Sequence, residues 1–145
     1  MKTENFFEHK NVAVLGVSSK KKKFGNYIYE KLLDSGYNAF AVNPNADVNN
    51  EIKFYKSIEE LNNISSVVFV TKPNVTNQIL TNKLPDNIKY IWIQQGAGDD
   101  ETKSILSSLN IDFVYDKCVM MYLEPVKGIH KFHRTFSKIF GSYKN

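Results

Sequence analysis

The sequence predicts an α/β protein in which about five parallel strands form a doubly wound sheet with helices on both faces. Short runs rich in valine and isoleucine recur along the chain, as in "NVAVLGV" and "SSVVFV". Segments with apolar residues at helical spacing separate these runs. Strands that alternate with helices favour a parallel sheet, and right-handed crossovers then favour the doubly wound arrangement.

The first half of the chain supplies four predicted elements. Residues 11–17 are almost continuously apolar, which is typical of a strand covered on both faces. Residues 24–35 are predicted to form a helix that stops at Gly36. The apolar positions at helical spacing in this helix are Phe24, Ile28 and Leu32. Residues 37–44 form the second predicted strand, and the capping box "SIEE" at residues 57–60 predicts a short helix.

The second half continues the same alternation. Strands are predicted over residues 65–73, 88–96 and 111–116, and helices over residues 74–84 and 98–110. In the first of these helices, the side chains expected to face inward are Val75, Ile79 and Leu80. The second has three acidic residues at its start, which the helix dipole favours.

Length and composition indicate a single domain. A chain of 145 residues is long enough to bury a substantial core, which we place at about residues 11–121 of a domain spanning residues 1–145. No apolar run approaches the roughly 18 residues that span a bilayer, and the N-terminus lacks the apolar core of a signal peptide. One cysteine excludes an internal disulfide, and we expect a cytoplasmic location. The net charge of +4 only weakly favours anionic partners.

A doubly wound sheet predicts where a ligand binds, because such folds bind ligands at the carboxyl ends of their strands. Gly16, Ser18 and Ser19 follow the first predicted strand, and Gly25 lies at the start of the next helix. Glycines, hydroxyls and a helix N-terminus together favour a phosphate. The loop departs from both the G-x-G-x-x-G and the G-x-x-x-x-G-K-[ST] patterns. The alternative is that its four lysines form a solvated turn.

The end of the second predicted strand argues against NAD. A site for NAD has an acidic residue here, which holds the ribose 2′-hydroxyl, whereas this chain has Asn43 and Pro44. A ribose that carries a phosphate tolerates the missing acid and would use a nearby lysine. Two such ligands fit, NADP and coenzyme A (CoA). The alternative is that Pro44 simply ends the strand.

The segments "VAVLGVSSKKKKFGNYIYEKLLDSGYNAFAVNPN", "FYKSIEEL", "IWIQQG" and "DKC" resemble the small stand-alone CoA-binding domain proteins. These proteins are related to the nucleotide-binding domain of the succinyl-CoA ligase alpha subunit, and the resemblance covers about residues 11–121. It implies a Rossmann-like fold that binds CoA or an acyl-CoA without catalysis. Together with the loop residues considered above, it gives the expected ligand-binding set Gly16, Ser18, Ser19, Lys20, Gly25, Asn26, Val42, Asn43, Pro44, Thr71, Lys72, Pro73, Gln94, Gly96 and Cys118.

Within that set the resemblance implies different roles. The loop from Gly16 to Asn26 would hold the pyrophosphate, with Lys20 at the basic position of the loop, although which of the four lysines at positions 20–23 contacts phosphate stays open. The "VNP" residues would line the adenosine, and residues 71–73 would face the ligand from the other side. Cys118 follows the last predicted strand, where its thiol could react with that of CoA if Lys117 lowered its pKa. The alternative is a buried, inert cysteine.

We expect no catalysis and no metal site. The related ligases use a phosphorylated histidine on a separate domain that is absent here, and none of the three histidines, His9, His130 and His133, lies at a predicted strand end. The competing hypothesis is an NADP-binding oxidoreductase or redox-sensing regulator, which would share the fold and the phosphate loop. Nucleic-acid binding is disfavoured, because Arg134 is the only arginine.

The C-terminal segment predicts one further helix, at about residues 127–141. Its apolar residues fall on one helical face, and its charged residues are all basic. We expect this helix to pack on its own domain, on a second copy in a homodimer, or on a partner protein. A basic amphipathic helix can also lie on an anionic membrane surface, but stable membrane insertion is not expected.

Overall fold

The computed structural model describes residues 3–48, 51–82 and 84–123. The strands are β1 (Asn11–Leu15), β2 (Asn38–Val42), β3 (Phe54–Tyr55), β4 (Ser66–Phe69), β5 (Tyr90–Gln94) and β6 (Asp112–Lys117). The helices are α1 (Thr3–Phe7), α2 (Phe24–Asp34), α3 (Pro73–Thr81) and α4 (Asp100–Ser108), with the 3₁₀ helices η1 (Ile58–Glu60) and η2 (Val119–Tyr122).

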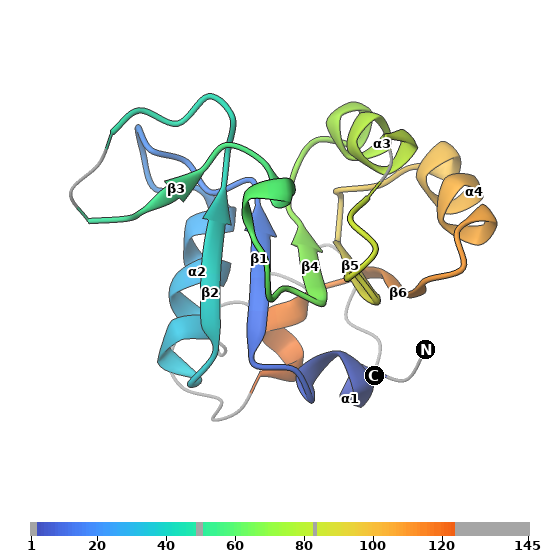
Figure 1. The fold of residues 1–145 in the computed structure, drawn as a ribbon, viewed down its shortest axis with the longest axis horizontal. Coiled ribbons are helices and arrows are strands. Elements are labelled where there is room, and N and C mark those ends of the chain that lie inside the picture. The colour runs from blue at the N-terminus through green and yellow to red at the C-terminus, as the bar shows by residue number, and fades with distance from the viewer. Residues whose placement is uncertain (1–2, 49–50, 83, 124–145) are drawn as a thin grey trace, which may run out of the picture.

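The described strands form one six-stranded sheet in the order β3-β2-β1-β4-β5-β6, and every neighbouring pair is parallel (Figure 1). The chain runs outward from β1 through β2 to β3, and then crosses to the other side of β1 for β4 to β6. The strand order therefore reverses between β1 and β4. This topology confirms the predicted doubly wound, Rossmann-like α/β fold.

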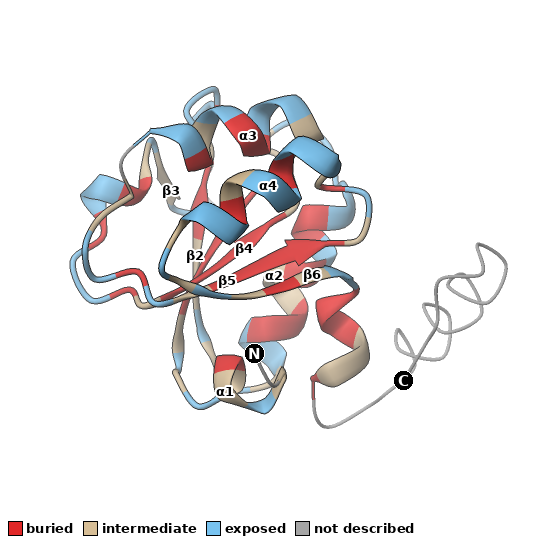
Figure 2. Ribbon diagram, turned by 90° about the vertical axis from the view of Figure 1, so that its right-hand side faces the viewer, coloured by how far each residue is buried: buried red, intermediate tan, exposed pale blue. Residues whose placement is uncertain are grey.

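Helices cover both faces of the sheet, with α2 on one face and α3 and α4 on the other (Figure 2). Successive side chains of a strand point to opposite faces, so β1 contributes to two cores. Val12 and Val14 belong to the core on the α2 side, whereas Ala13 and Leu15 belong to the core under α3 and α4. All four are buried, which explains why the strand is apolar at consecutive positions.

Helix α2 ends where the sequence predicts. Gly36 has a φ of 85°, a left-handed conformation that costs glycine little. Its N–H donates to the carbonyl of Leu33 at 3.1 Å, and the N–H of Tyr37 donates to the carbonyl of Leu32 at 3.0 Å. These two bonds form the Schellman motif, which caps the last carbonyls of the helix.

Three described elements lie outside the predicted set, and each is short. The two-residue β3 extends the sheet beyond the five predicted strands, η2 follows β6, and α1 precedes β1. Phe6 of α1 is fully buried, with its ring edge-on to Trp92 at a centroid distance of 5.3 Å. Segments of two to five residues are too short for periodicity to predict, so tertiary contacts reveal them.

The segment predicted as a capping box differs from the expectation. It forms the single 3₁₀ turn η1, in which Ser57 makes no side-chain cap bond. The Glu60 carboxylate instead accepts a hydrogen bond at 3.0 Å from the backbone N–H of Lys56, one residue earlier than a capping box requires. Glu60 therefore stabilises the turn directly after β3.

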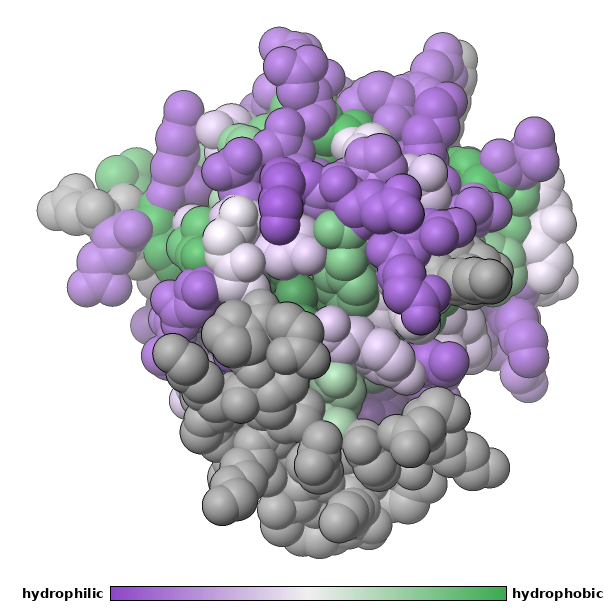
Figure 3. Space-filling view, turned by 90° about the horizontal axis from the view of Figure 1, so that it is seen from below, coloured by the Kyte–Doolittle hydropathy of each residue, from purple (hydrophilic) through white to green (hydrophobic). Residues whose placement is uncertain are grey.

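The predicted C-terminal helix at residues 127–141 lies outside the described residues. Within the described part of the chain, no helix has the length and hydropathy needed to cross a membrane. Seen from the edge where the strands begin, the described surface is largely hydrophilic, with small hydrophobic areas between the polar side chains (Figure 3).

Candidate functional site

A cleft of about 720 Å³ opens at the carboxyl ends of β1, β2 and β4. It spans the point where the strand order reverses, which is the place where doubly wound folds bind ligands. Five segments form its walls: the loops after β1, β2 and β4, the segment after β3, and helix α3 together with the residues that follow it.

The cleft gathers about half of the residues that the sequence places at the ligand. Those that line it are Gly16, Ser18, Gly25, Val42, Asn43, Pro44, Thr71 and Lys72. Those outside its lining are Ser19, Lys20, Asn26, Pro73, Gln94, Gly96 and Cys118. The first group comes from four separate segments of the chain that meet at one edge of the sheet. Ligand contacts by both groups stay predictions, and the structure gives several residues of the second group contacts within the domain.

Gly16 ends β1 at the floor of the cleft. Its φ of 110° is one that only glycine adopts readily. A Cβ at this position would lie 2.9 Å from the carbonyl carbon and oxygen of Val70, so the backbone directly after β4 also excludes a side chain here. The turn out of the sheet therefore depends on glycine for two independent reasons.

Gly25 has a packing role beside the one that the sequence suggested. We expected glycine here because a phosphate would approach it closely. In the structure, a Cβ on Gly25 would overlap the carbonyl oxygen of Gly16 and lie 2.8 Å from its carbonyl carbon. The missing side chain therefore lets the first turn of α2 pack against the end of β1, which places the helix N-terminus at the cleft.

Asn26 holds the loop between β1 and α2 in shape. Its amide is buried and forms two bonds with the backbone of Ser18: the Ser18 N–H donates to Oδ1 at 2.9 Å, and Nδ2 donates to the Ser18 carbonyl at 2.9 Å. The N–H of Lys23 donates to the same Oδ1 at 3.3 Å. Asn26 thus joins both ends of the lysine-rich segment.

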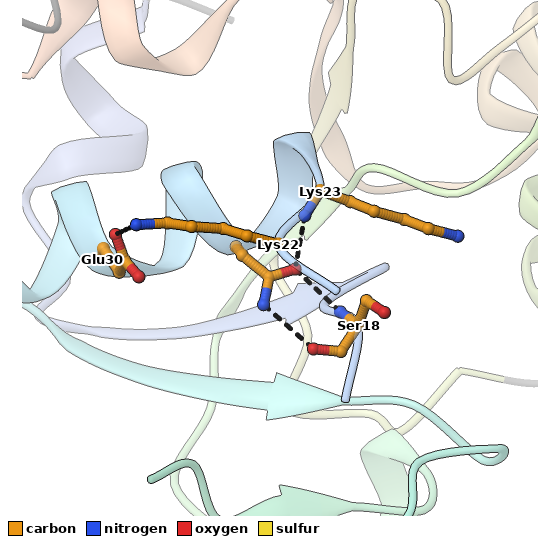
Figure 4. Close-up of polar contacts among 5 residues, drawn as sticks. Ser18, Lys22, Lys23 and Glu30 are labelled. Carbon is orange, nitrogen blue, oxygen red and sulfur yellow. Dashed lines mark hydrogen bonds and ion pairs between the residues drawn. The ribbon is translucent and has the colours of Figure 1, made fainter. Parts of the chain in front are cut away.

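The lysines at positions 20–23 are not equivalent. Lys22 points back along α2, where its ammonium forms an ion pair with Glu30 at 2.8 Å, and the hydrogen bond to Glu30 raises the pKa of Lys22. Lys23 extends in another direction and lines the cleft (Figure 4). The backbone N–H groups of Lys20 and Lys21 lie 3.3 and 3.4 Å from the Ser18 hydroxyl oxygen. The geometry therefore favours Lys23, rather than Lys20, as the lysine that meets an anion in the cleft.

The loop after β2 is tied to the loop after β1. The Asn43 side-chain amide donates to the carbonyl of Val17 at 2.8 Å and accepts from the N–H of Asn45 at 2.9 Å. The Ser19 hydroxyl accepts from the N–H of Asp47 at 2.9 Å. These bonds give Asn43 and Ser19 a structural role and fix the wall at which the ribose of a nucleotide is expected.

Sequence reasoning missed two parts of the lining. Lys56, Ser57 and Glu59 line the cleft from the segment after β3, a strand too short to predict. Val75 of α3 also lines it, although we expected Val75 to face the core, and Ile79 lines it while packing against the core as predicted. Val75 is 36% exposed, whereas Leu80 is buried as predicted. Helical spacing identifies an apolar face but does not show whether that face meets a core or a cleft.

A second cluster joins the ends of β5 and β6. Gln94 is 2% exposed, and its side-chain oxygen accepts from the N–H of Val119 at 3.0 Å. The N–H of Gly96 lies 3.3 Å from a carboxylate oxygen of Asp116, and the Trp92 indole donates to the carbonyl of Lys117 at 2.7 Å. These contacts hold the turns after the two strands together.

Cys118 belongs to this second cluster and is 5% exposed. Burial raises the pKa of its thiol to about 11, against the lowering effect of a hydrogen bond with Gln94. The reactive-thiol hypothesis required the opposite shift. The alternative, a buried apolar residue, therefore describes this cysteine better.

We expect the Cys118 thiol of the folded protein to react with iodoacetamide at pH 8 at least tenfold more slowly than in urea, because both burial and the raised pKa suppress the thiolate. Mass spectrometry would measure the rate, and the single cysteine makes the assignment unambiguous. Equal rates for folded and unfolded protein would contradict the buried position.

His9, the one histidine among the described residues, does not line the cleft. His9 stacks on Tyr90 at a centroid distance of 4.7 Å, next to the start of β5 and so at the opposite edge of the sheet. His130 and His133 lie outside the described residues. Among the residues that the structure describes, no three histidine, cysteine, aspartate or glutamate side chains are grouped to hold a metal ion.

The fold and the position of the cleft define a Rossmann-like α/β domain with its binding edge at the strand reversal. The comparison with protein families then identifies the chain more closely. It belongs to the CoA-binding domain family, whose model matches residues 10–124.

Known proteins support this assignment. The uncharacterized protein YneT of Bacillus subtilis (strain 168) is 25% identical over 115 residues, which cover 76% of this chain and 82% of that protein. A conserved hypothetical protein from Pyrococcus furiosus has a similar structure, with a TM-score of 0.70 and 31% identity, over 78% of this chain and 98% of that one. A hypothetical protein from Pyrococcus horikoshii OT3 gives a TM-score of 0.70 at 24% identity, over 83% of this chain and 88% of that one, and therefore supports the fold alone.

Proposed function

We propose that this protein binds CoA or an acyl-CoA without catalysing a reaction, with the pyrophosphate at the loop between β1 and α2. The observation that carries the proposal is the shape of that loop. Gly16, Gly25 and Asn26 fix it by backbone packing and by hydrogen bonds within the domain, at the edge of a cleft large enough for a nucleotide. The loop therefore has its shape before any ligand arrives, which lowers the entropic cost of binding.

The electrostatics of the loop suit a pyrophosphate. Helix α2 begins at the cleft, and the N–H groups of a first helical turn carry partial positive charge. Lys23 adds a full positive charge on the same wall, and Lys72 adds another from the loop after β4. A diphosphate between these walls would meet positive charge from two sides.

The family assignment favours CoA over NADP. Both ligands tolerate the absence of an acidic residue at Asn43 and Pro44, so the strand end does not separate them. The alternative function, an NADP-binding oxidoreductase or redox-sensing regulator, would use a proton-transferring side chain such as histidine beside the nicotinamide, or a reactive thiol. The described cleft is lined by neither histidine nor cysteine, and we propose a binding role in the cytoplasm rather than an enzymatic one.

Two further proposals concern the evolutionary origin of the domain and its contacts with other chains. We propose a common origin with the nucleotide-binding domain of the succinyl-CoA ligase alpha subunit, on the basis of the sequence segments that resemble it. We also propose that residues 127–141 mediate contact with a second copy or a partner protein. Sedimentation of the full chain beside a chain truncated after Leu123 would test the second point.

The first experiment is a calorimetric titration of the full chain with CoA, acetyl-CoA, NADP and NAD, after native mass spectrometry of the freshly purified protein. CoA or acetyl-CoA is expected to bind, with NADP and NAD much weaker. Binding to NADP alone would instead favour the redox function. Binding to none of the four would contradict a nucleotide site.

Lys23→Gln is expected to weaken CoA binding roughly tenfold, because a charged hydrogen bond contributes about 1.5–3 kcal/mol and partial exposure reduces this value. Lys53→Gln removes the same charge outside the cleft lining and serves as the control. Isothermal titration would measure both. If Lys20→Gln weakens binding and Lys23→Gln does not, the assignment of the working lysine is wrong.

A further inference from the structure

We propose that Lys56 recognises a phosphate on the adenosine ribose of the ligand, and so selects CoA over dephospho-CoA. This inference rests on the proposed function and names the residue that sets its specificity. It begins from the wall of the cleft that the sequence did not predict, the segment directly after β3.

Lys56 lies one strand away from the position that the missing acid would occupy. Strand β3 pairs in parallel with β2, with Tyr55 opposite Val42, and the N–H of Asn43 donates to the carbonyl of Tyr55 at 2.9 Å. Asn43 and Lys56 are therefore neighbours at the carboxyl ends of adjacent strands, and both line the cleft. The ribose end of the cleft thus has a lysine directly after β3, where an NAD site would have a carboxylate at the end of β2.

The Lys56 ammonium is held at this wall. Its Nζ donates to the carbonyl of Ala46 at 2.9 Å, and its backbone N–H donates to Glu60 at 3.0 Å. An ammonium has three N–H donors, so two remain for other acceptors. The contact with Ala46 limits the freedom of a side chain that would otherwise lose considerable entropy on binding.

Other residues at this end of the cleft bear on the same assignment. The loop after β2 contributes Pro44 and Asn45, and the turn after β3 contributes Ser57 and Glu59. Glu59 opposes an anion and could instead accept a ribose hydroxyl. The position of Lys56 thus predicts that CoA binds more tightly than dephospho-CoA, whereas the position of Glu59 predicts the reverse. A comparison of the two ligands tests which residue dominates.

The test compares ligands that differ by one phosphate. CoA and dephospho-CoA are titrated by calorimetry against the full-length wild type, Lys56→Gln, Lys56→Arg and Lys53→Gln. We expect the wild type to bind CoA roughly tenfold more tightly than dephospho-CoA, and Lys56→Gln to remove the difference by weakening CoA alone. Lys56→Arg keeps the charge and is expected to retain the preference, as is Lys53→Gln, whose ammonium lies 5.1 Å from the Tyr55 ring centroid and outside the cleft lining.

The ratio of the CoA affinity to the dephospho-CoA affinity separates loss of phosphate recognition from a general disturbance of the cleft. Loss of the Ala46 contact alone would weaken the binding of both ligands together. A preference that survives in Lys56→Gln overturns this inference and leaves the proposed function intact. The inference is also overturned if the wild type binds dephospho-CoA as tightly as CoA and the Glu59→Gln variant binds both ligands more weakly. If the chain binds neither CoA nor dephospho-CoA but prefers NADP to NAD through Lys56, the phosphate recognition stands and the proposed function fails.

Discussion

Replacing Gly25 with alanine is expected to abolish measurable CoA binding and to lower the free energy of unfolding by about 1–3 kcal/mol. The added methyl group would overlap the backbone carbonyl of Gly16, so the first turn of α2 must move away from the end of β1. That movement displaces the helix N-terminus and Lys23 from the cleft. Calorimetric titration would measure the affinity, and urea denaturation would measure the stability.

Gly36→Ala is the matched control for this substitution. Gly36 has a φ of 85° and nothing within 4 Å of the position that a Cβ would take, so alanine costs about 1–2 kcal/mol in backbone strain without a steric clash. It lies at the far end of α2, away from the cleft. Wild-type affinity in Gly36→Ala beside none in Gly25→Ala would show that the loss follows from the clash. Full binding by Gly25→Ala would refute the role of this packing.

Asn26→Ala is expected to weaken CoA binding at least tenfold and to lower the free energy of unfolding by about 2–3 kcal/mol. The substitution removes three hydrogen-bonded contacts from a buried amide and leaves the N–H and carbonyl of Ser18 without their partner. The segment from Ser18 to Lys23 then loses its fixed path, and binding must pay the entropy of ordering it. Calorimetric titration would measure the CoA affinity, and urea denaturation would measure the free energy of unfolding.

Asn26→Asp removes only the hydrogen bond that the Asn26 side chain donates and keeps those that it accepts. Aspartate keeps an acceptor for the N–H groups of Ser18 and Lys23, but it cannot donate to the Ser18 carbonyl and it adds a negative charge beside the phosphate loop. We expect stability between that of the wild type and that of Asn26→Ala, with CoA affinity reduced as much as in Asn26→Ala. Asn38→Ala, which loses an exposed contact with Asn11 at the opposite edge of the sheet, is the control. An unchanged affinity in both Asn26 variants would contradict the loop-holding role.

The long elements of the fold could be predicted because local rules determine them. Strand β1 is apolar at consecutive positions since both its faces are covered, and α2 ends at Gly36 since only glycine adopts the required φ without cost. The helix starts that the sequence indicates were also close, as at α4, where the Asp99 carboxylate accepts from the N–H of Thr102 at 2.9 Å. Each of these signals lies within a few residues of the feature that it predicts.

The candidate site was predictable only in part. Parallel strands place Gly16, Asn43 and Thr71 at one edge of the sheet, so the general position of the cleft followed from the order of elements. The individual roles did not follow. Asn26 was expected at the ligand, a prediction that stays open, and its bonds with Ser18 hold the loop. Of Lys20 and Lys23, Lys23 lines the cleft. Which way a surface lysine points depends on partners such as Glu30, which the loop sequence does not specify.

The sequence by itself determined the alternation of strands and helices, the glycine- and lysine-containing loop after the first strand and the absence of an acidic residue after the second strand, because these depend on residue type and spacing along the chain. Only the tertiary structure decided that Gly25 is required by the Gly16 backbone, that Cys118 is buried, and that Lys56 lies beside Asn43 at the cleft. Each of these facts depends either on a contact between segments that are distant in sequence or on the path that the backbone takes through a turn. Such contacts arise from packing in three dimensions, which local patterns in a single sequence do not encode.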